Sequence, residues 1–309
     1  MAGPRVAGVF GARPTITFPA GPPPAGVHVT EPATGEGAPL EPGGVAVVQY
    51  TAHLWDGREN RLLASTFNRG TPTAFPLGAL PPGLDTALEG RRAGSRVTAA
   101  IPLRAGSSGD GHVRSSTPYH PASGTLSETA ASGPASGTGP GSMGVSPASG
   151  SASGAADLFY VIDILGAHPA GAVVEAGAGA VAGVRVGGGA VPALEIPEGE
   201  PPERMAVAVL ARGAGPPAGT GRLLVVQYAG ATWSDRRVFT STWERGRPEA
   251  VTIGDGSVIA GWNRALADVS AGSRVAMVVP PGDAYGDTGT DAVPPGETLV
   301  FVVDVLAAY

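Results

Sequence analysis

The sequence predicts two tandem α+β domains, each an antiparallel β-sheet wrapped around one short α-helix. The first observation is an internal repeat with a shift of 178 positions, in which Val-Val-Gln-Tyr at 47–50 reappears at 225–228. The second is that each copy consists mostly of short runs of β-branched and aliphatic residues bounded by Gly and Pro. Because two copies are too few for a solenoid, the repeat indicates two globular domains.

Three runs in the second copy, residues 223–228, 274–279 and 298–306, are rich in Val and Leu and predict strands. One helix is expected in each copy. In the second copy it should span about 258–269, because Trp262, Leu266 and Val269 recur at helical spacing. Gly272 follows that stripe and should close it.

The repeat also sets the expected domain boundaries, which are 11–166 for the first domain and 189–309 for the second. Near the end of each copy the shift falls from 178 to 141, so the first copy carries about 37 extra residues. They lie at about 106–156, a stretch of Gly, Ser, Ala, Thr and Pro that cannot bury enough apolar surface to fold. We therefore expect a disordered insertion there, and a Gly/Ala-rich linker at 167–188.

Composition excludes several classes of function. The chain has no cysteine, which excludes disulfides, a thiol nucleophile and Cys-ligated metal. Its five histidines show no ligand spacing, so no metal site is expected. A net charge of −6 argues against a nucleic-acid partner. No apolar run approaches the roughly 18 residues that a membrane span requires.

Six short motifs of the second copy stand in a recognisable order: Val-Val-Gln-Tyr at 225–228, Val-Phe-Thr-Ser-Thr at 238–242, Val-Ile-Ala-Gly-Trp at 258–262, Pro-Pro-Gly-Asp-Ala-Tyr-Gly at 280–286, Val-Pro-Pro at 293–295 and Thr-Leu-Val-Phe at 298–301. Over roughly residues 201–306 the chain resembles the FKBP-type peptidyl-prolyl cis–trans isomerases. Its tandem arrangement resembles the two-domain proteins of this family in actinobacteria.

The resemblance implies a pocket for a proline ring. Its floor would be Trp262 and its walls Tyr228, Phe239, Val251 and Phe301. The remaining implied contacts are a peptide bound through the backbone of Val258 and Ile259, a ligand carbonyl bonded by the Tyr285 hydroxyl, a closing loop that carries Val293, and a polar position at Thr240. Thr240 stands where an aspartate is common and Val251 where an aromatic is common, so turnover is expected to be slower.

The first copy keeps only part of this set. Tyr50 and Phe75 hold two wall positions, and Tyr160 replaces the last phenylalanine. Leu84 stands at the tryptophan position, and Pro81, which has no N–H to donate, occupies the peptide-binding dipeptide. Leu63 and Ala64 replace the residues equivalent to Phe239 and Thr240. We expect this copy to fold but not to catalyse.

The sequence thus predicts a peptidyl-prolyl isomerase that assists protein folding, with its activity in the C-terminal domain. Rotation about an X–Pro bond breaks no covalent bond, so no cofactor or metal is required. Proline-containing polypeptides would be the clients, and a monomer is expected. The resemblance also implies a macrolide inhibitor as a ligand, although Thr240 removes a usual polar contact.

Two alternatives remain open at this stage. The protein could be a non-catalytic peptide-binding or chaperone module, which Thr240 and Val251 favour, or the first copy could recognise clients and deliver them to the second. For localisation, the absence of an apolar leader predicts a cytoplasmic protein. The resemblance instead implies an exported envelope lipoprotein if the N-terminus is truncated.

Overall fold

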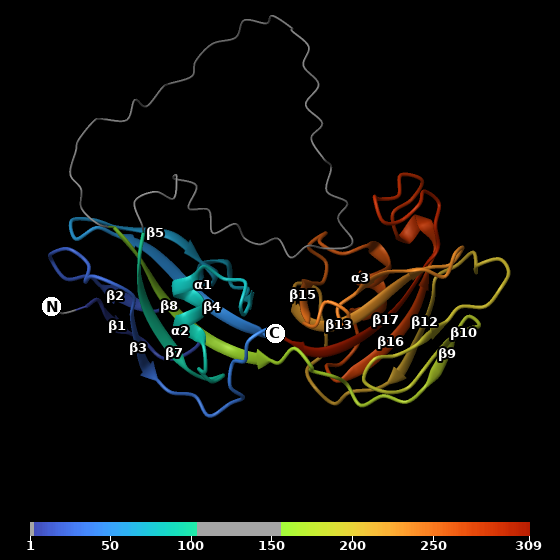
Figure 1. The fold of residues 1–309 in the computed structure, drawn as a ribbon, viewed down its shortest axis with the longest axis horizontal. Helices are drawn as coiled ribbons and strands as arrows, with labels where there is room; N and C mark the ends of the chain where they lie inside the picture. The colour runs from blue at the N-terminus through green and yellow to red at the C-terminus, as the bar shows by residue number, and fades with distance from the viewer. Residues whose placement is uncertain (1–2, 104–155) are drawn as a thin grey trace, which may run out of the picture.

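The computed structural model describes residues 3–103 and 156–309, which form two units built on six-stranded antiparallel sheets (Figure 1). The first sheet has the order β3-β7-β8-β4-β5 with β6 beside β4, and the second has the order β12-β16-β17-β13-β14 with β15 beside β13. The two orders correspond strand by strand, which confirms the predicted fold class. The expected insertion at 106–156 lies outside the described residues, apart from Ala156.

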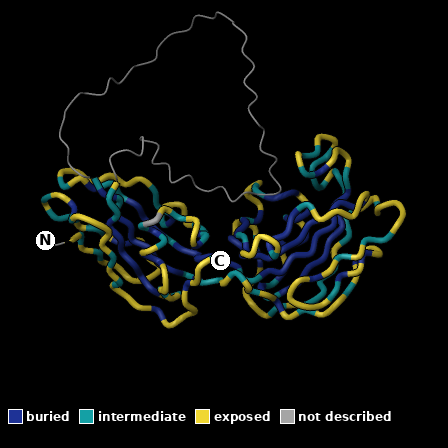
Figure 2. The backbone as a smooth tube through the Cα atoms, viewed as in Figure 1, coloured by how far each residue is buried: buried dark blue, intermediate teal, exposed yellow. Residues whose placement is uncertain are grey.

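The strands of the first sheet are β3 (His28–Ala33), β4 (Val45–Trp55), β5 (Asn60–Ser65), β6 (Thr73–Pro76), β7 (Arg96–Pro102) and β8 (Asp157–His168). Those of the second are β12 (Ala206–Ala211), β13 (Leu223–Thr232), β14 (Val238–Ser241), β15 (Glu249–Thr252), β16 (Ser273–Val279) and β17 (Leu299–Ala308). The central strands of both sheets are almost wholly buried (Figure 2).

The sheets carry short helices, two in the first unit and one in the second among the described residues. The helices are α1 (Thr66–Arg69), α2 (Pro82–Leu88) and α3 (Ala260–Leu266), with a 3-10 turn η1 (Pro281–Asp283). The expected helix at 258–269 is therefore shorter than predicted, because the backbone is still extended at Ile259. No helix in the described part of the chain is long and apolar enough to cross a membrane.

The outer face of each sheet is covered by a lead-in hairpin. In the first unit β1 (Arg5–Ala7) and β2 (Thr15–Thr17) place apolar side chains on Phe159 and Val161. In the second, a three-stranded sheet of β9 (Gly179–Val181), β10 (Val184–Val186) and β11 (Leu194–Glu195) packs on Val300 and Val302. The segment 167–188 is thus more than a linker. Its second half belongs to the outer layer of the second unit, because its three valines alternate inward and are buried.

A buried arginine–aspartate pair ties each lead-in hairpin to its sheet. Arg274 and Asp304 face each other across β16 and β17 at 2.6 and 2.7 Å, and neither is exposed. Arg96 and Asp163 form the same two-bond pair in the first unit. The guanidinium of Arg274 also donates to the carbonyl of Gly189, beyond β10, and that of Arg96 donates to three carbonyls in the loop between β1 and β2.

The two units touch through equivalent parts of their sheets. Val47 of β4 and Val225 of β13, which occupy the same place in the repeat, are both fully buried in one apolar cluster between the units. His168, at the end of β8, makes a 2.8 Å hydrogen bond to the hydroxyl of the C-terminal Tyr309. In Figure 1 the C-terminus accordingly lies between the two units. Burial lowers the pKa of His168 to about 4 and raises that of Tyr309 to about 12.

Removing the charge from one member of the buried pair should strongly destabilise the second unit. Asp304→Asn leaves the Arg274 guanidinium buried without its counter-charge, so we expect a loss of about 3–5 kcal/mol in the free energy of unfolding. Urea denaturation followed by tryptophan fluorescence measures it. Glu195→Gln is the control, because its partner Arg185 is 3.8 Å away and both are exposed. A loss below about 1 kcal/mol in Asp304→Asn would contradict the role given to the pair.

His168 should make the protein less stable in mild acid. Between pH 6.5 and about 4 the unfolded chain binds a proton at His168 that the folded chain excludes, so stability falls as the pH falls through this window. The loss should reach about 2 kcal/mol at pH 5. Melting temperatures at pH 7 and pH 5 test this, since His168→Gln should flatten the difference. His28→Gln, which changes an exposed histidine, should keep it. Equal pH dependence in His168→Gln and the wild type would disprove it.

Candidate active site

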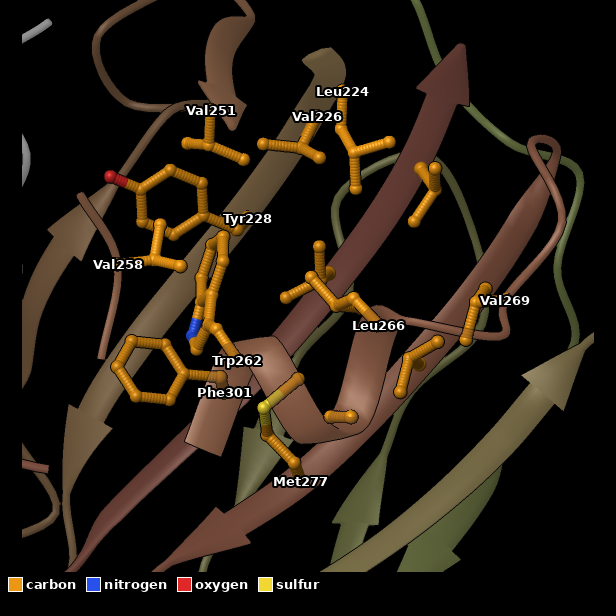
Figure 3. Packing of buried hydrophobic residues seen from close by; sticks show 14 of the residues in the cluster. Leu224, Val226, Tyr228, Val251, Val258, Trp262, Leu266, Val269, Met277 and Phe301 are labelled. Atoms are coloured by element: carbon orange, nitrogen blue, oxygen red, sulfur yellow. The ribbon is translucent and has the colours of Figure 1, made fainter. Parts of the chain in front are cut away.

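Four aromatic rings from four elements form what we call the aromatic centre: Tyr228 of β13, Phe239 of β14, Trp262 of α3 and Phe301 of β17. The Trp262 ring lies 5.0 Å from Tyr228 and 5.5 Å from Phe301, perpendicular to both within about one degree (Figure 3). Such edge-to-face contacts are the favoured geometry for aromatic pairs. These three rings are buried, whereas Phe239, 5.9 Å from Phe301, is half-buried. The centre is therefore a rigid apolar floor with one partly open side.

Gly230 makes room for two of these rings. It pairs with Phe301 across β13 and β17, and a Cβ atom at this position would lie 2.6 Å from the Phe301 ring and 2.9 Å from the Phe239 ring. Cβ atoms essentially never show contacts this short, so only glycine leaves room for both rings in these positions. The first unit has Ala52 at the equivalent place on β4 and a leucine, Leu63, in place of Phe239.

Aliphatic side chains surround the aromatic centre. Val251 of β15, Val258 and Ile259 before α3, and Val293 in the loop before β17 are all buried in the same cluster. The carbonyl of Ile259 accepts the first hydrogen bond of α3, from the Trp262 N–H. The N–H of Ile259 has no hydrogen-bond acceptor among the described residues.

Tyr285 approaches from the loop that follows η1. Its side chain is half-buried and packs against the apolar cluster, next to Ala284. The same loop is held closed by Thr290, which exchanges two backbone hydrogen bonds with Val293. Gly289 has a φ of +65°, and a side chain there would collide with the carbonyl of Val293. Both residues that the resemblance assigns to this loop therefore reach the pocket.

Polar side chains contact Tyr228 at its hydroxyl group. The Tyr228 hydroxyl donates to a carboxylate oxygen of Glu249 at 2.9 Å and accepts from the Arg245 guanidinium at 3.2 Å. Arg245 also donates to Glu249 at 2.8 Å and to the Thr240 hydroxyl at 2.9 Å, and its guanidinium carbon lies 5.6 Å from the centre of the Tyr228 ring. We use the name polar cluster for Thr240, Arg245, Glu249 and the Tyr228 hydroxyl.

Burial is the main cause of the pKa shifts in the polar cluster. It raises the pKa of the Tyr228 hydroxyl, and the nearby charge of Glu249 raises it further. Burial also raises the pKa of Glu249, although the Tyr228 hydroxyl and Arg245 oppose that change by stabilising the carboxylate. At neutral pH the tyrosine is therefore protonated and is held as a hydrogen-bond donor to Glu249.

The equivalent region of the first unit has a different composition. Tyr50 lies 5.3 Å from Phe75 and 6.3 Å from Tyr160, and burial raises the pKa of Tyr160 to about 12. Leu84 of α2 is buried in the place of Trp262, and Leu63 is about 40% exposed. This core is closed and apolar, but it has no indole floor.

The structure brings the ten sequence-predicted site residues together. Nine of them lie in or against one apolar cluster, and Thr240 lies at its polar edge. Their roles on a substrate stay predictions. Sequence reasoning missed Arg245 and Glu249. The arginine was visible as a repeat of Arg69, whereas Glu249 has no such signal, because Thr73 stands at its place in the first copy.

Comparison with known proteins places the chain among characterised relatives. A family model described as FKBP-type peptidyl-prolyl cis-trans isomerase matches residues 37–120 and 215–306. An FK506-binding protein of Streptomyces anulatus is 37% identical over 118 residues, which are 38% of this chain and 95% of that protein. A probable FK506-binding protein of Corynebacterium glutamicum is 32% identical over 117 residues, 38% of this chain and 98% of that protein. The peptidyl-prolyl cis-trans isomerase Fkbp12 of Drosophila melanogaster is 40% identical over 87 residues, 28% of this chain and 80% of that protein.

A methyl group on Gly230 should displace the aromatic centre. Gly230→Ala forces Phe301 or Phe239 out of its position, so we expect a loss of about 1–3 kcal/mol in the stability of the second unit. Urea denaturation measures this loss, and near-UV circular dichroism reports the disturbed rings. Gly282→Ala is the matched control, because its Cβ would meet no atom within 4 Å. An unchanged near-UV spectrum in Gly230→Ala would refute the close packing described.

Proposed function

Because this chain belongs to the FKBP-type peptidyl-prolyl cis–trans isomerase family, we propose that the isomerase activity resides in its second unit, at the aromatic centre. The observation that carries this proposal is the perpendicular packing of Trp262 against both Tyr228 and Phe301. This geometry supports an apolar aromatic floor for a proline ring. The first unit would serve as a non-catalytic partner.

The chemistry follows from the planarity of the peptide bond. Resonance gives the X–Pro bond a rotation barrier of roughly 18–20 kcal/mol, and the twisted amide at the top of that barrier has less charge separation than the planar form. A dry apolar pocket favours the less charge-separated state, and each 1.4 kcal/mol of such preference gives about a tenfold rate increase. The proline ring would lie on Trp262. The N–H of Ile259, which has no acceptor among the described residues, would donate a hydrogen bond to a peptide carbonyl next to that ring.

The first unit lacks the groups that this mechanism uses. Its floor position is Leu84, and its peptide-binding position is Pro81, which has no N–H to donate. The neighbouring Leu80 N–H is already bonded to the carboxylate of Asp85 at 3.1 Å. No backbone donor equivalent to that of Ile259 is thus offered at this place, which supports assigning turnover to the second unit.

The substrates would be proline-containing polypeptides, and the biological role would be to assist their folding. Two relatives are named for binding FK506, so a macrolide ligand is proposed for the same pocket. Val251 leaves the pocket with a smaller wall than an aromatic residue would give, and this favours the alternative of a non-catalytic peptide-binding or chaperone module. The assay below separates the two functions.

Replacing the floor of the pocket with the residue that the first copy carries should strongly lower activity. Trp262→Leu in the full chain should lower kcat/KM for an X–Pro peptide by at least about tenfold, because the ring-stacking surface is lost while the site stays apolar. A protease-coupled or NMR exchange assay of cis–trans isomerisation measures it.

Trp233→Leu is the matched control. Trp233 is as buried as Trp262 but packs in the outer layer of the same unit, so its loss should lower stability and leave kcat/KM within about twofold. Activity above half of the wild-type value in Trp262→Leu would place turnover elsewhere. A wild-type protein that binds the peptide without accelerating its isomerisation would favour the peptide-binding alternative.

A further inference from the structure

Tyr228 lies opposite a break in the edge of its sheet. Residues 223–226 of β13 pair with β15, and residues 229–231 pair with β14, so Tyr228 stands between the two paired stretches. Glu249 begins β15 and Thr240 lies near the end of β14, so one residue flanks Tyr228 on each side. A group that holds the Tyr228 hydroxyl can therefore be supplied from either strand.

In this protein the carboxylate comes from β15. Position 240, where the family commonly has an aspartate, is a threonine whose hydroxyl accepts a hydrogen bond from Arg245. Glu249 bonds both the Tyr228 hydroxyl and the Arg245 guanidinium, at 2.9 and 2.8 Å, and its side chain is only 13% exposed. The Tyr228 hydroxyl thereby donates one hydrogen bond to Glu249 and accepts one from Arg245.

The first unit shows the same position without the carboxylate. It keeps a tyrosine, Tyr50, and the arginine equivalent to Arg245, which is Arg69. Thr73 stands where Glu249 would be, and Ala64 stands where Thr240 would be. The carboxylate is therefore found only in the unit that also has the tryptophan floor.

We propose that Glu249 is a positioning residue of the isomerase pocket, whose carboxylate holds Tyr228 and Arg245 in place of an aspartate at position 240. The inference rests on the proposed function of the second unit. Tyr228 then acts as a fixed wall, because its hydroxyl proton is committed to Glu249. The donors left for the substrate are those of other groups, such as the Ile259 N–H.

The carboxylate has two physical effects on the pocket. It fixes the Tyr228 ring perpendicular to Trp262, which keeps the floor and this wall in one geometry. It also balances the guanidinium of Arg245, whose charge otherwise stands at the edge of an apolar site with no other carboxylate bonded to it among the described residues. An unbalanced cation there would attract water and weaken the preference for the twisted amide.

The test uses three full-length variants and an X–Pro tetrapeptide as substrate. Glu249→Ala should lower kcat/KM about tenfold. Thr240→Asp added to Glu249→Ala should recover at least half of the lost activity, because it places a carboxylate beside Arg245 from the other strand. Glu244→Ala, which removes an exposed carboxylate from the same turn, is the control and should stay within about twofold of the wild type.

The outcomes separate this inference from the proposed function. An inactive wild type would overturn both the isomerase assignment of the second unit and the role of Glu249 in it. An active wild type with an equally active Glu249→Ala variant would overturn the role of Glu249 alone. If Thr240→Asp does not recover the activity lost in Glu249→Ala, the proposed role of Glu249 is also overturned. A purely structural contribution of the Glu249 side chain at its own position would explain that result, because a carboxylate at position 240 would not replace it. Recovery by the second carboxylate, with a melting temperature near that of Glu249→Ala, would establish positioning.

Discussion

The buried pair of Arg274 and Asp304 fixes the register on which the second unit depends. The two residues face each other across β16 and β17, on the outer face of the sheet. Because side chains alternate along a strand, the same pairing places Phe301 on the inner face, in contact with Trp262. A slip of one residue would turn Phe301 outward and would leave two buried charges without partners. The strand register, the outer layer and the aromatic floor are therefore set together.

A short motif around Arg274 contains most of the residues that fix this strand register. Gly272 has a φ of +89°, the hydroxyl of Ser273 accepts the N–H of Gly213, and Arg274 enters the buried pair. In the first unit Gly94, Ser95 and Arg96 do the same, with the Ser95 hydroxyl bonded to the N–H of Gly35. Both copies therefore keep four equivalent residues, which are the pairs Gly94 and Gly272, Ser95 and Ser273, Arg96 and Arg274, and Asp163 and Asp304. The scaffold is thus common to both units, and the differences concentrate in the pocket.

The fold class and much of the candidate site could be predicted from the sequence, because the internal repeat shows which residues the two copies have in common. The fold class and the place of the aromatic residues follow from motifs such as Val-Phe-Thr at 238–240, whose order is visible in one dimension. The outer position of the segment 179–186 could not be predicted, because Gly and Ala dominate it and only three valines mark its buried face. The Arg274–Asp304 contact was also hidden, since the residues are 30 positions apart and their pairing depends on sheet register.

On the proposed function, the polar cluster explains why a pocket for a neutral reaction tolerates charge at its edge. Isomerisation moves no proton and breaks no bond, so the apolar floor must stay free of unbalanced charge. The Tyr228 hydroxyl nevertheless needs a partner, and Arg245 needs a counter-charge. One carboxylate at the break between β14 and β15 meets both requirements, and Glu249 supplies it from the strand opposite to Thr240. We infer that such a pocket requires a charge-balanced acceptor at that break, rather than a particular residue at one sequence position.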